Sequence, residues 1–467
     1  MQLDLHILDE RAVSVIGLGK SGIATAQSLL ASGVQIQCWD DAEVARKTAT
    51  DLGLPLQPPE EMDPGMVVLS PGVPLTHPEP HPIVAKARAN RAPIIGDVEL
   101  LYRACPSAQF IGVTGTNGKS TTTALIAHIL ETAGEKFQVG GNLGTPVLEL
   151  EPMENDGVYV LEMSSFQLDL LSSTVFKAAV LLNVTPDHLD RHGDMEGYVA
   201  AKEHIFDRQG HDEVAIVSVD DDYCEKVYQR LNTMERCVCP ISITRAVPGG
   251  VYVRDDSLFD AIDGQAYSPM KLSTAPKLPG KHNAQNIAAA YAACRAVGVP
   301  TGKITDGIRS FPGLVHRQEI FADLHGLQFV NDSKATNAEA AARALASFER
   351  IYWIAGGREK EGGYDPLTPH LSKVRRTFLI GEAASSLSEF LEGKVDYEVC
   401  GELRVAVLKA LALAMDEGAQ GAVILLSPAC ASFDQFVSFE ARGDAFKSIV
   451  TKILKSAGGG SAVKESS

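Results

Sequence analysis

Short apolar runs that end in glycine, serine or a carboxylate recur along this chain. The first three cover residues 12–16, 34–39 and 66–69, and stretches with helical spacing of apolar residues follow at 23–31 and 82–90. Short apolar strands that alternate with helices are typical of parallel sheets covered on both faces. The pattern therefore predicts an α/β fold built from βαβ units.

The same alternation restarts twice further along the chain. The central part contains two apolar runs, two helix-like stretches and a group of short strand-like pieces that predicts a small peripheral sheet; these are 157–162, 178–184, 198–206, 287–297 and 257–273. The last part contains four more apolar runs, at 328–330, 351–355, 377–380 and 422–426. We therefore expect domains at 1–97, 98–312 and 313–457, followed by a disordered Gly/Ser-rich tail at 458–467.

Composition narrows the classes of function. The 467 residues include 42 Lys plus Arg and 59 Asp plus Glu, a net charge of −17. This acidic balance disfavours a nucleic-acid or anionic-membrane surface, so we expect neither partner. The start of the chain lacks a signal-peptide pattern and no apolar run reaches membrane-spanning length, which predicts a soluble, cytoplasmic protein. Eight cysteines without a CxxC pair predict reduced structural thiols.

A glycine-rich stretch in the middle of the chain is the strongest chemical signal. It comprises Gly115, Thr116, Asn117, Gly118, Lys119, Ser120 and Thr121, and a helix-like run follows it. Small residues let backbone N–H groups surround a phosphate, the lysine reaches the terminal phosphates, and the serine hydroxyl can bind Mg²⁺. We interpret the stretch as a phosphate-binding loop; the alternative is a Thr-rich turn before a helix.

A second glycine-rich loop follows the first apolar run. Residues 17–22 have GxGxxG spacing, and Asp40 ends the next predicted strand. This arrangement fits a dinucleotide or another diphosphate, and the adjacent Asp41 argues against a 2′-phosphate. The turn at 70–74 is expected to form a second wall of the same crevice.

Polar groups also follow two predicted strands of the central part. Glu162 ends one strand in the position of a metal-binding carboxylate, and residues 185–192 form a loop rich in Asp and His. Parallel sheets place sites at these strand ends, although such a loop can also be simply solvated. Lys202 lies on a predicted helix, where a lysine by itself is expected to be exposed.

Taken together, these motifs resemble those of the ATP-dependent Mur ligases of peptidoglycan synthesis. The matching stretches are 115–120, 183–191, 198–202, 282–286, 316–317 and 332–334, together with Glu162, and the resemblance covers nearly the whole chain. Within the family, 332–337 and 427–436 are similar to the members that add D-glutamate. The resemblance implies three domains: an N-terminal Rossmann-like one, a central P-loop ATPase with a parallel sheet and a C-terminal Rossmann-like one.

The resemblance also implies an activity and substrates. A Mur ligase of this kind adds D-glutamate to UDP-N-acetylmuramoyl-L-alanine through an acyl phosphate formed from ATP, and we expect a monomer. The residues that match the family's contacts to the UDP-substrate are Lys20, Ser21, Asp40, Ser70, Gly72 and Asn142. Those that match its ATP contacts are the phosphate-binding loop with Asn286, Arg317 and Asp332.

Two Mg²⁺ sites are implied as well, with Ser120, Glu162, His188 and Lys202 as metal residues. Because an ammonium group repels Mg²⁺, Lys202 is expected to be carbamylated, as in relatives. Lys119, His188 and Lys202 are the expected catalytic residues; whether His188 acts as a base stays open. The residues implied for D-glutamate are Arg317, Lys334, Thr336, Lys360, Ser432 and Phe439.

Three alternatives stay open on the sequence. Another Mur ligase or a folylpolyglutamate synthetase would share the central domain and differ in the third. An NAD-dependent dehydrogenase would use the first glycine loop and Asp40. A P-loop ATPase switch would hydrolyse nucleotide without any UDP-sugar.

Overall fold

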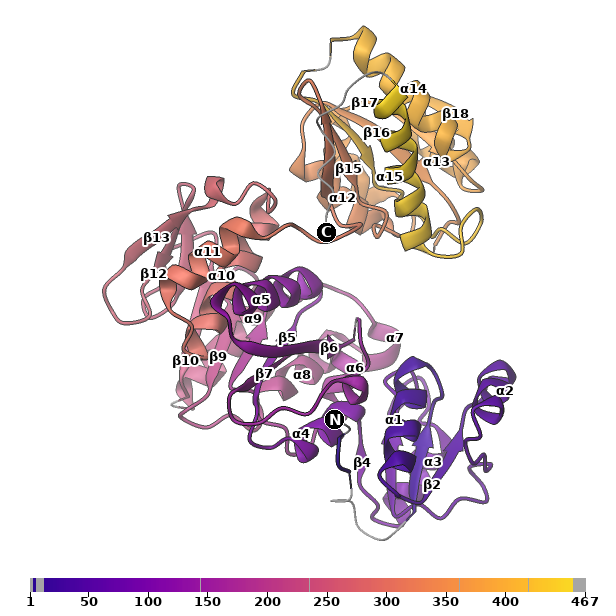
Figure 1. Cartoon of the computed structure of the whole chain (residues 1–467), viewed down its shortest axis with the longest axis vertical. Coiled ribbons are helices and arrows are strands. Elements are labelled where there is room, and N and C mark those ends of the chain that lie inside the picture. The colour runs from indigo at the N-terminus through magenta and orange to yellow at the C-terminus, as the bar shows by residue number, and fades with distance from the viewer. Residues whose placement is uncertain are drawn as a thin grey trace. The chain divides into compact units, whose positions relative to one another are not determined.

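The computed structural model describes residues 3–5, 12–142, 144–234, 236–360, 362–418 and 420–456 (Figure 1). The predicted tail at 458–467 lies outside the described residues. The chain divides into two compact units, the first comprising residues up to Phe311 except 277–280, and the second comprising 277–280 with the residues from Pro312. The boundary near Asp97 stays a prediction.

The first part of the first unit is a four-stranded parallel sheet in the order β2-β1-β3-β4. Its elements are β1 (Val13–Ile16), α1 (Lys20–Ala31), β2 (Ile36–Trp39), α2 (Glu43–Asp51), β3 (Met66–Leu69), α3 (Pro82–Ala89) and β4 (Ile94–Ile95). The four residues of β1 are all buried, as expected for a strand with neighbours on both edges and helices on its faces.

The rest of the first unit is built on a sheet of nine described strands in the order β13-β12-β11-β10-β9-β8-β5-β7-β6. Its strands are β5 (Gln109–Thr114), β6 (Lys136–Gly141), β7 (Gly157–Glu162), β8 (Ala178–Leu181), β9 (Val214–Ser218), β10 (Val238–Ser242), β11 (Val251–Arg254), β12 (Ser257–Asp260) and β13 (Tyr267–Lys271). Its helices are α4 (Asp97–Ala104), α5 (Lys119–Ala133), α6 (Ser165–Leu168), α7 (Leu189–His192), α8 (Met195–Glu203), α9 (Asp222–Thr233), α10 (Lys281–Ala296) and α11 (Thr301–Ser310).

The second unit contains a six-stranded sheet in the order β14-β15-β19-β16-β17-β18, parallel except for β14. Its elements are β14 (Glu319–Leu324), β15 (Leu327–Asn331), α12 (Ala338–Ser347), β16 (Ile351–Gly356), β17 (Val374–Ile380), α13 (Ala384–Leu391), β18 (Tyr397–Gly401), α14 (Leu403–Asp416), β19 (Val423–Leu426) and α15 (Phe439–Ser456). One core packs α14 and α15 on one face of the sheet, and a second packs α12 and α13 on the other (Figure 1).

The predicted fold class is confirmed, but several predicted elements were placed wrongly. The pieces at 257–273 do not form a separate peripheral sheet, because β11 pairs in parallel with β10 and extends the central sheet. The helices predicted from 23 and 287 begin earlier, at Lys20 and Lys281. At the first of these, Gly19 is the N-cap, so the glycine loop runs directly into the helix.

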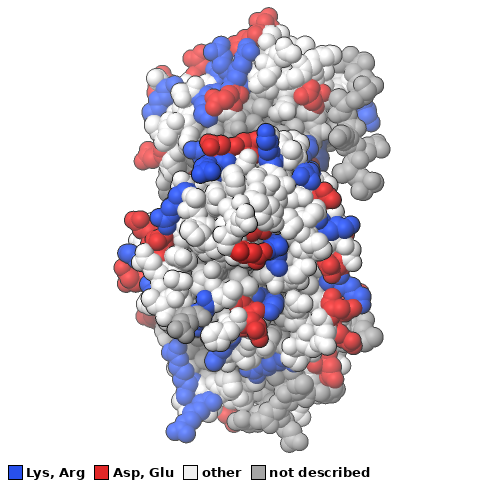
Figure 2. All heavy atoms as spheres, turned by 90° about the vertical axis from the view of Figure 1, so that its left-hand side faces the viewer, with Lys and Arg blue, Asp and Glu red and all other residues white. Residues whose placement is uncertain are grey.

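The surface, the cysteines and the helices each add one observation. On the face shown in Figure 2, Lys and Arg side chains are interspersed with Asp and Glu. All eight cysteines are free thiols, in agreement with the sequence prediction. No helix in the described part of the chain is long and apolar enough to cross a membrane.

Candidate active site

The three sheets share one feature that places the candidate sites. In each sheet a central strand lies between two parallel neighbours: β1 between β2 and β3, β5 between β7 and β8, and β19 between β15 and β16. In open parallel sheets, ligands bind beyond the carboxyl ends of strands where the connections diverge. The predicted site residues follow these strands.

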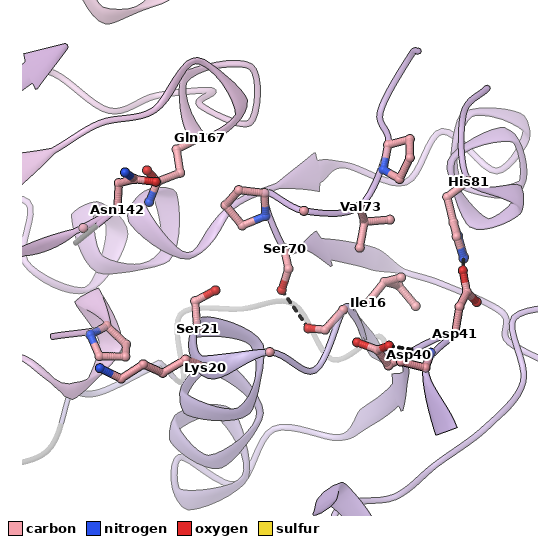
Figure 3. A pocket seen from close by; sticks show the side chains of 18 of the residues that line it. Ile16, Lys20, Ser21, Asp40, Asp41, Ser70, Val73, His81, Asn142 and Gln167 are labelled. Carbon is pink, nitrogen blue, oxygen red and sulfur yellow. Dashed lines mark hydrogen bonds and ion pairs between the residues drawn. The ribbon is translucent and has the colours of Figure 1, made fainter. Parts of the chain in front are cut away.

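A cavity of about 630 Å³ lies beyond β1, β2 and β3 in the first unit (Figure 3). Its lining includes all six residues predicted for the UDP-substrate: Lys20, Ser21, Asp40, Ser70, Gly72 and Asn142. Asn142 follows β6 of the nine-stranded sheet, so the cavity also has a wall from that part of the unit. The structure thus brings together residues that are more than a hundred positions apart in the sequence.

The glycine loop of this cavity requires glycine at two of its three glycine positions, 17 and 22. Gly17 has a φ of +88°, and a Cβ on it would lie 2.7 Å from Cβ of Ser70. A Cβ on Gly22 would lie 1.8 Å from the carbonyl oxygen of Gly17, so α1 can pack against the loop only with glycine there. Ser70 fixes the opposite wall, because its Oγ donates to that same carbonyl at 2.7 Å.

Asp40 is held in place by the loops around it. Its Oδ2 accepts from the backbone N–H of Leu18 at 2.6 Å, and its Oδ1 accepts from that of Ala42 at 2.8 Å. Beside it, His81 lies 3.5 Å from a carboxylate oxygen of Asp41 (Figure 3). His81 belongs to no recognisable motif, so nothing in the sequence alone indicated its place in the cavity.

Arg191 ties the cavity wall to α7. Its guanidinium donates to the carbonyl oxygens of Gly72 at 3.1 Å and Val73 at 3.3 Å, and lies 4.6 Å from the centroid of the Phe166 ring. Arginine suits this position because its planar fork can bind several oxygens while it stacks on an aromatic ring. Since α7 directly follows His188, the wall and the predicted metal loop are mechanically linked.

The phosphate-binding loop between β5 and α5 is packed against α10. Gly118 has a φ of +86°, and a Cβ on it would lie 2.4 Å from Oδ1 of Asn286. The hydroxyl of Thr122 donates to that same Oδ1 at 3.2 Å. The predicted neighbourhood of Asn286 and the loop is therefore present in the fold, and glycine is required at the point of closest approach.

Asn183, which follows β8, braces the same loop from its other side. It accepts from the backbone N–H of Asn117 at 2.8 Å and donates through Nδ2 to the carbonyl of Asn117 at 3.1 Å. The side chain of Lys119 donates to the carbonyls of Gly115 and Thr116, both at 2.9 Å. The lysine ammonium is thus already at the concave face of the loop that would hold phosphates.

Lys202 is buried on α8, unlike the exposed lysine that its helical position by itself would predict. Only 1% of it is exposed, and its Nζ lies 4.4 Å from the centroid of the Tyr198 ring. Burial, together with repulsion from Lys119, lowers the pKa of Lys202 to about 7. No carboxylate among the described residues forms an ion pair with it.

The predicted metal residues suit Mg²⁺ only in part. Ser120 and Glu162 are buried oxygen donors, and Glu162 accepts from Nδ2 of Asn142 at 3.0 Å. His188 is the N-cap of α7 with a φ of +52°, and its ring centroid is 5.0 Å from that of Phe166. The described residues contain no group of three or more His, Cys, Asp and Glu side chains that could hold a metal ion. Lys202 fits the set only after its positive charge has been replaced by an oxygen ligand.

The loops beyond β15 and β19 contain three of the six residues predicted for the amino acid, and Phe439 begins the helix that follows the second loop. Lys334 has its Nζ 5.4 Å from the centroid of the Phe439 ring, and Ser432 is buried. Thr336 is half-buried and donates its backbone N–H to the carbonyl of Lys334 at 2.8 Å. Lys360 is exposed in the segment after β16.

Asp332 is the buried acid at the end of β15. It accepts from the hydroxyl of Ser427 at 2.7 Å and from the backbone N–H of Gln318 at 3.1 Å. Burial raises the pKa of Asp332 to about 7, and the positive charge of Arg317 acts against that rise. Asp332 and Arg317 therefore lie close enough to influence each other.

The fold and these loops define a nucleotide-binding α/β protein with a phosphate-binding loop at the centre of its largest sheet. Residues 113–294 match the Mur ligase middle domain, and residues 316–430 match the Mur ligase glutamate ligase domain. The chain belongs to the Mur ligase family.

Individual relatives agree with this assignment. The chain is 46% identical to the UDP-N-acetylmuramoylalanine--D-glutamate ligase of Paramagnetospirillum magneticum over 96% of this chain and 98% of that protein. It is 48% identical to the protein of that name from Rhodospirillum rubrum over 94% of each chain. Its fold is similar to that of the UDP-N-acetylmuramate-alanine ligase of Thermotoga maritima, with a TM-score of 0.56 and 18% identity over 96% of this chain and all of that one.

Proposed function

We propose that the chain adds D-glutamate to UDP-N-acetylmuramoyl-L-alanine with ATP, in the synthesis of peptidoglycan precursors. The observation that carries the proposal is the cavity beyond β1, because it gathers every residue predicted for the UDP-substrate. The relatives above, whose names specify D-glutamate, support the choice of amino acid.

The chemistry begins with activation of a carboxylate. An amine does not displace oxide or hydroxide from a carboxylate, so the γ-phosphoryl group of ATP is first transferred to the carboxylate of the UDP-substrate. Lys119 stabilises the negative charge on the β- and γ-phosphates, and the backbone of residues 115–121 surrounds them. Asn286 lies beside the loop, where it can bind the nucleotide, and we assign the same role to Arg317 and Asp332.

Mg²⁺ supplies Lewis-acid neutralisation of the phosphate oxygens. We assign one ion to Ser120 and Glu162 and a second to His188 and Lys202. A carbamate on Lys202 would provide an anionic oxygen, which an ammonium cannot. Its formation requires a neutral amine, and burial favours that form of Lys202.

The carbamate can be tested by ¹³C NMR after exposure of the protein to ¹³CO₂. A carbamate signal that is absent from Lys202→Arg would support this role of Lys202. An unmodified amine in saturating CO₂ would contradict it.

The amine of D-glutamate then attacks the acyl phosphate, and phosphate leaves. D-Glutamate has two carboxylates, so an acidic protein must supply local cations for it. We assign this role to Arg317, Lys334 and Lys360, with Thr336, Ser432 and Phe439 as further contacts. The other predictions, namely a monomer in the cytoplasm without nucleic-acid or membrane partners, form part of the same proposal.

The test is phosphate release in the presence of ATP, Mg²⁺ and UDP-N-acetylmuramoyl-L-alanine. D-Glutamate, L-glutamate, L-alanine and meso-diaminopimelate are supplied in separate reactions. We expect turnover with D-glutamate alone. Preference for another amino acid would retain the family and overturn the assignment of the amino acid, whereas phosphate release without any UDP-sugar would favour an ATPase switch.

Two lysine variants provide a matched control for that assay. Lys119→Met removes the ammonium from the phosphate-binding loop and should abolish turnover. Lys394→Met makes the same change at an exposed position of the second unit and should leave turnover unchanged. Equal activity of the two variants would contradict the role of the loop.

A further inference from the structure

Arg442, on α15 of the second unit, is a fully buried cation outside every predicted set of site residues. Only 1% of it is exposed, and no carboxylate among the described residues forms an ion pair with it. Burial lowers the pKa of Arg442 to about 10, so the guanidinium still carries its charge at neutral pH. A buried charge without a counter-ion is costly unless many dipoles solvate it.

Backbone and hydroxyl oxygens solvate this charge, and they come from three separate loops. Nε donates to Oγ of Ser333 at 3.0 Å, and one terminal nitrogen donates to the carbonyls of Ser333 at 2.9 Å and Cys430 at 3.1 Å. The other terminal nitrogen donates to the carbonyls of Ala431 at 3.3 Å and Gly356 at 3.4 Å. The acceptors lie at or just beyond the carboxyl ends of β15, β19 and β16, the three adjacent strands whose carboxyl ends form the candidate amino-acid site.

The contacts to Ser333 and Ala431 fix the backbone next to two residues predicted to bind the amino acid. Ser333 immediately precedes Lys334, and Ala431 immediately precedes Ser432. The hydroxyl of Ser333, which accepts from Arg442, donates in turn to the carbonyl of Phe439 at 2.8 Å. One guanidinium therefore sets the relative positions of all three residues.

We propose that Arg442 is a positioning residue for the amino-acid substrate, holding three loops in register and supplying a fixed positive potential that favours a dicarboxylate. This inference rests on the proposed function. Arginine is required because its planar fork reaches acceptors on different loops at once, which a lysine ammonium on a flexible stem cannot do.

The experiment compares the kinetics of Arg442→Met and Arg442→Lys with those of the wild type. The KM for the amino acid that the wild type uses best should rise about 100-fold in Arg442→Met and about 10-fold in Arg442→Lys, which keeps the charge and loses the fork. The KM for the UDP-substrate should stay within about threefold of the wild type, since that ligand does not contact these loops in the proposed function. The KM for ATP should rise less than that for the amino acid, because only Asp332, which directly precedes Ser333, is assigned to the nucleotide here. Arg404→Met, an exposed arginine on α14, is the matched control and should change none of them.

Ser333→Ala keeps the experiment decisive if the arginine variants fail to fold. It removes one acceptor and the link to Phe439, and should raise the same KM by about fivefold, with a smaller loss of stability. A fall in the melting temperature with an unchanged amino-acid KM would overturn the inference, as would equal rises in all three KM values. If the wild type prefers an amino acid other than D-glutamate, the proposed function fails, and a selective rise for that amino acid would still support Arg442 as the positioning residue.

Discussion

Lys202 in the first unit and Arg442 in the second are both buried cations without a carboxylate partner among the described residues, yet their surroundings differ. The described contact of the Lys202 ammonium is the face of the Tyr198 ring. Arg442 donates to five oxygens on three loops. Burial, with repulsion from Lys119, lowers the pKa of Lys202 from an ordinary 10.5 to about 7, whereas burial lowers that of Arg442 from 12.5 to about 10.

The difference shows how one fold can use a buried cation in two ways. A lysine with few acceptors loses its proton near neutral pH, which makes the amine available for covalent modification. An arginine surrounded by acceptors keeps its charge and acts through geometry. The higher ordinary pKa of arginine and the oxygens around its guanidinium together separate the two roles.

The largest expected effect is on catalysis by Lys202→Arg. A guanidinium is always charged and cannot become an anionic metal ligand, so we expect kcat to fall about a thousandfold. Steady-state phosphate release measures this. Lys226→Arg, at an exposed position on α9, is the control. If Lys202→Arg kept more than a tenth of the wild-type kcat, Lys202 would not act as a ligand.

The second effect is on stability: two methionine variants should change the free energy of unfolding in opposite directions. Arg442→Met should lower the free energy of unfolding by about 2–4 kcal/mol, because five buried oxygens lose their donor. Lys202→Met should raise it by about 1–3 kcal/mol at pH 7, because a poorly solvated charge is replaced by an apolar chain. Urea unfolding monitored by circular dichroism measures both.

If Arg442→Met and Lys202→Met changed the free energy of unfolding in the same direction, the contrast drawn between the two buried cations would be wrong. In that case the count of oxygen acceptors would not be what distinguishes the two cations. Arg404→Met supplies the baseline for an exposed arginine.

The third effect is the pH dependence of the increase in the free energy of unfolding that Lys202→Met should cause. The pKa of Lys202 is lowered from an ordinary 10.5 to about 7 in the folded protein, so its burial destabilises the fold fully below pH 7. That penalty shrinks as the pH rises from 7 to 10.5, because the folded lysine is already neutral there and the unfolded lysine loses its proton more and more easily. The stabilisation by Lys202→Met should therefore be largest at or below pH 7 and shrink above it. Urea titrations in CO₂-free buffer measure this trend, and a gain independent of pH would contradict it.

The smallest expected effect is on stability and concerns a buried anion, Glu99, which can be compared with the two buried cations. Glu99 on α4 accepts from the backbone N–H groups of Ser173 and Thr174 and from Nε of Arg103. Burial raises its pKa, but the hydrogen bonds outweigh burial, so the pKa lies below its ordinary 4.5. Glu99→Gln should destabilise the fold by about 1–2 kcal/mol at pH 7, since the amide replaces an acceptor by a donor.

The sign of the pH effect at Glu99 follows from the lowered pKa. The stabilisation is present above the unfolded pKa and is lost as the pH falls through the folded value. The difference between Glu99→Gln and the wild type should therefore narrow below about pH 4. Thermal unfolding between pH 7 and pH 3 tests this, and a constant difference would show that the charge contributes nothing.

The sequence by itself determined what contiguous motifs encode. The phosphate-binding loop, the glycine loop with Asp40, and Glu162 at a strand end were predictable because local geometry needs those residue types at fixed spacing. The α/β class followed from the alternation of short apolar runs and helices. Exact helix starts were less predictable, since a glycine loop can lead straight into a helix, as it does at Lys20.

Only the tertiary structure decided which distant residues meet and which charges are buried. Asn286 packs against Gly118 because α10 crosses the start of α5, and neither segment encodes that approach alone. A lysine or arginine in a helix looks the same in sequence whether it faces solvent or the core. The burial of Lys202 and the oxygen shell around Arg442 therefore arise from segments that come together only when the sheets and their loops are assembled.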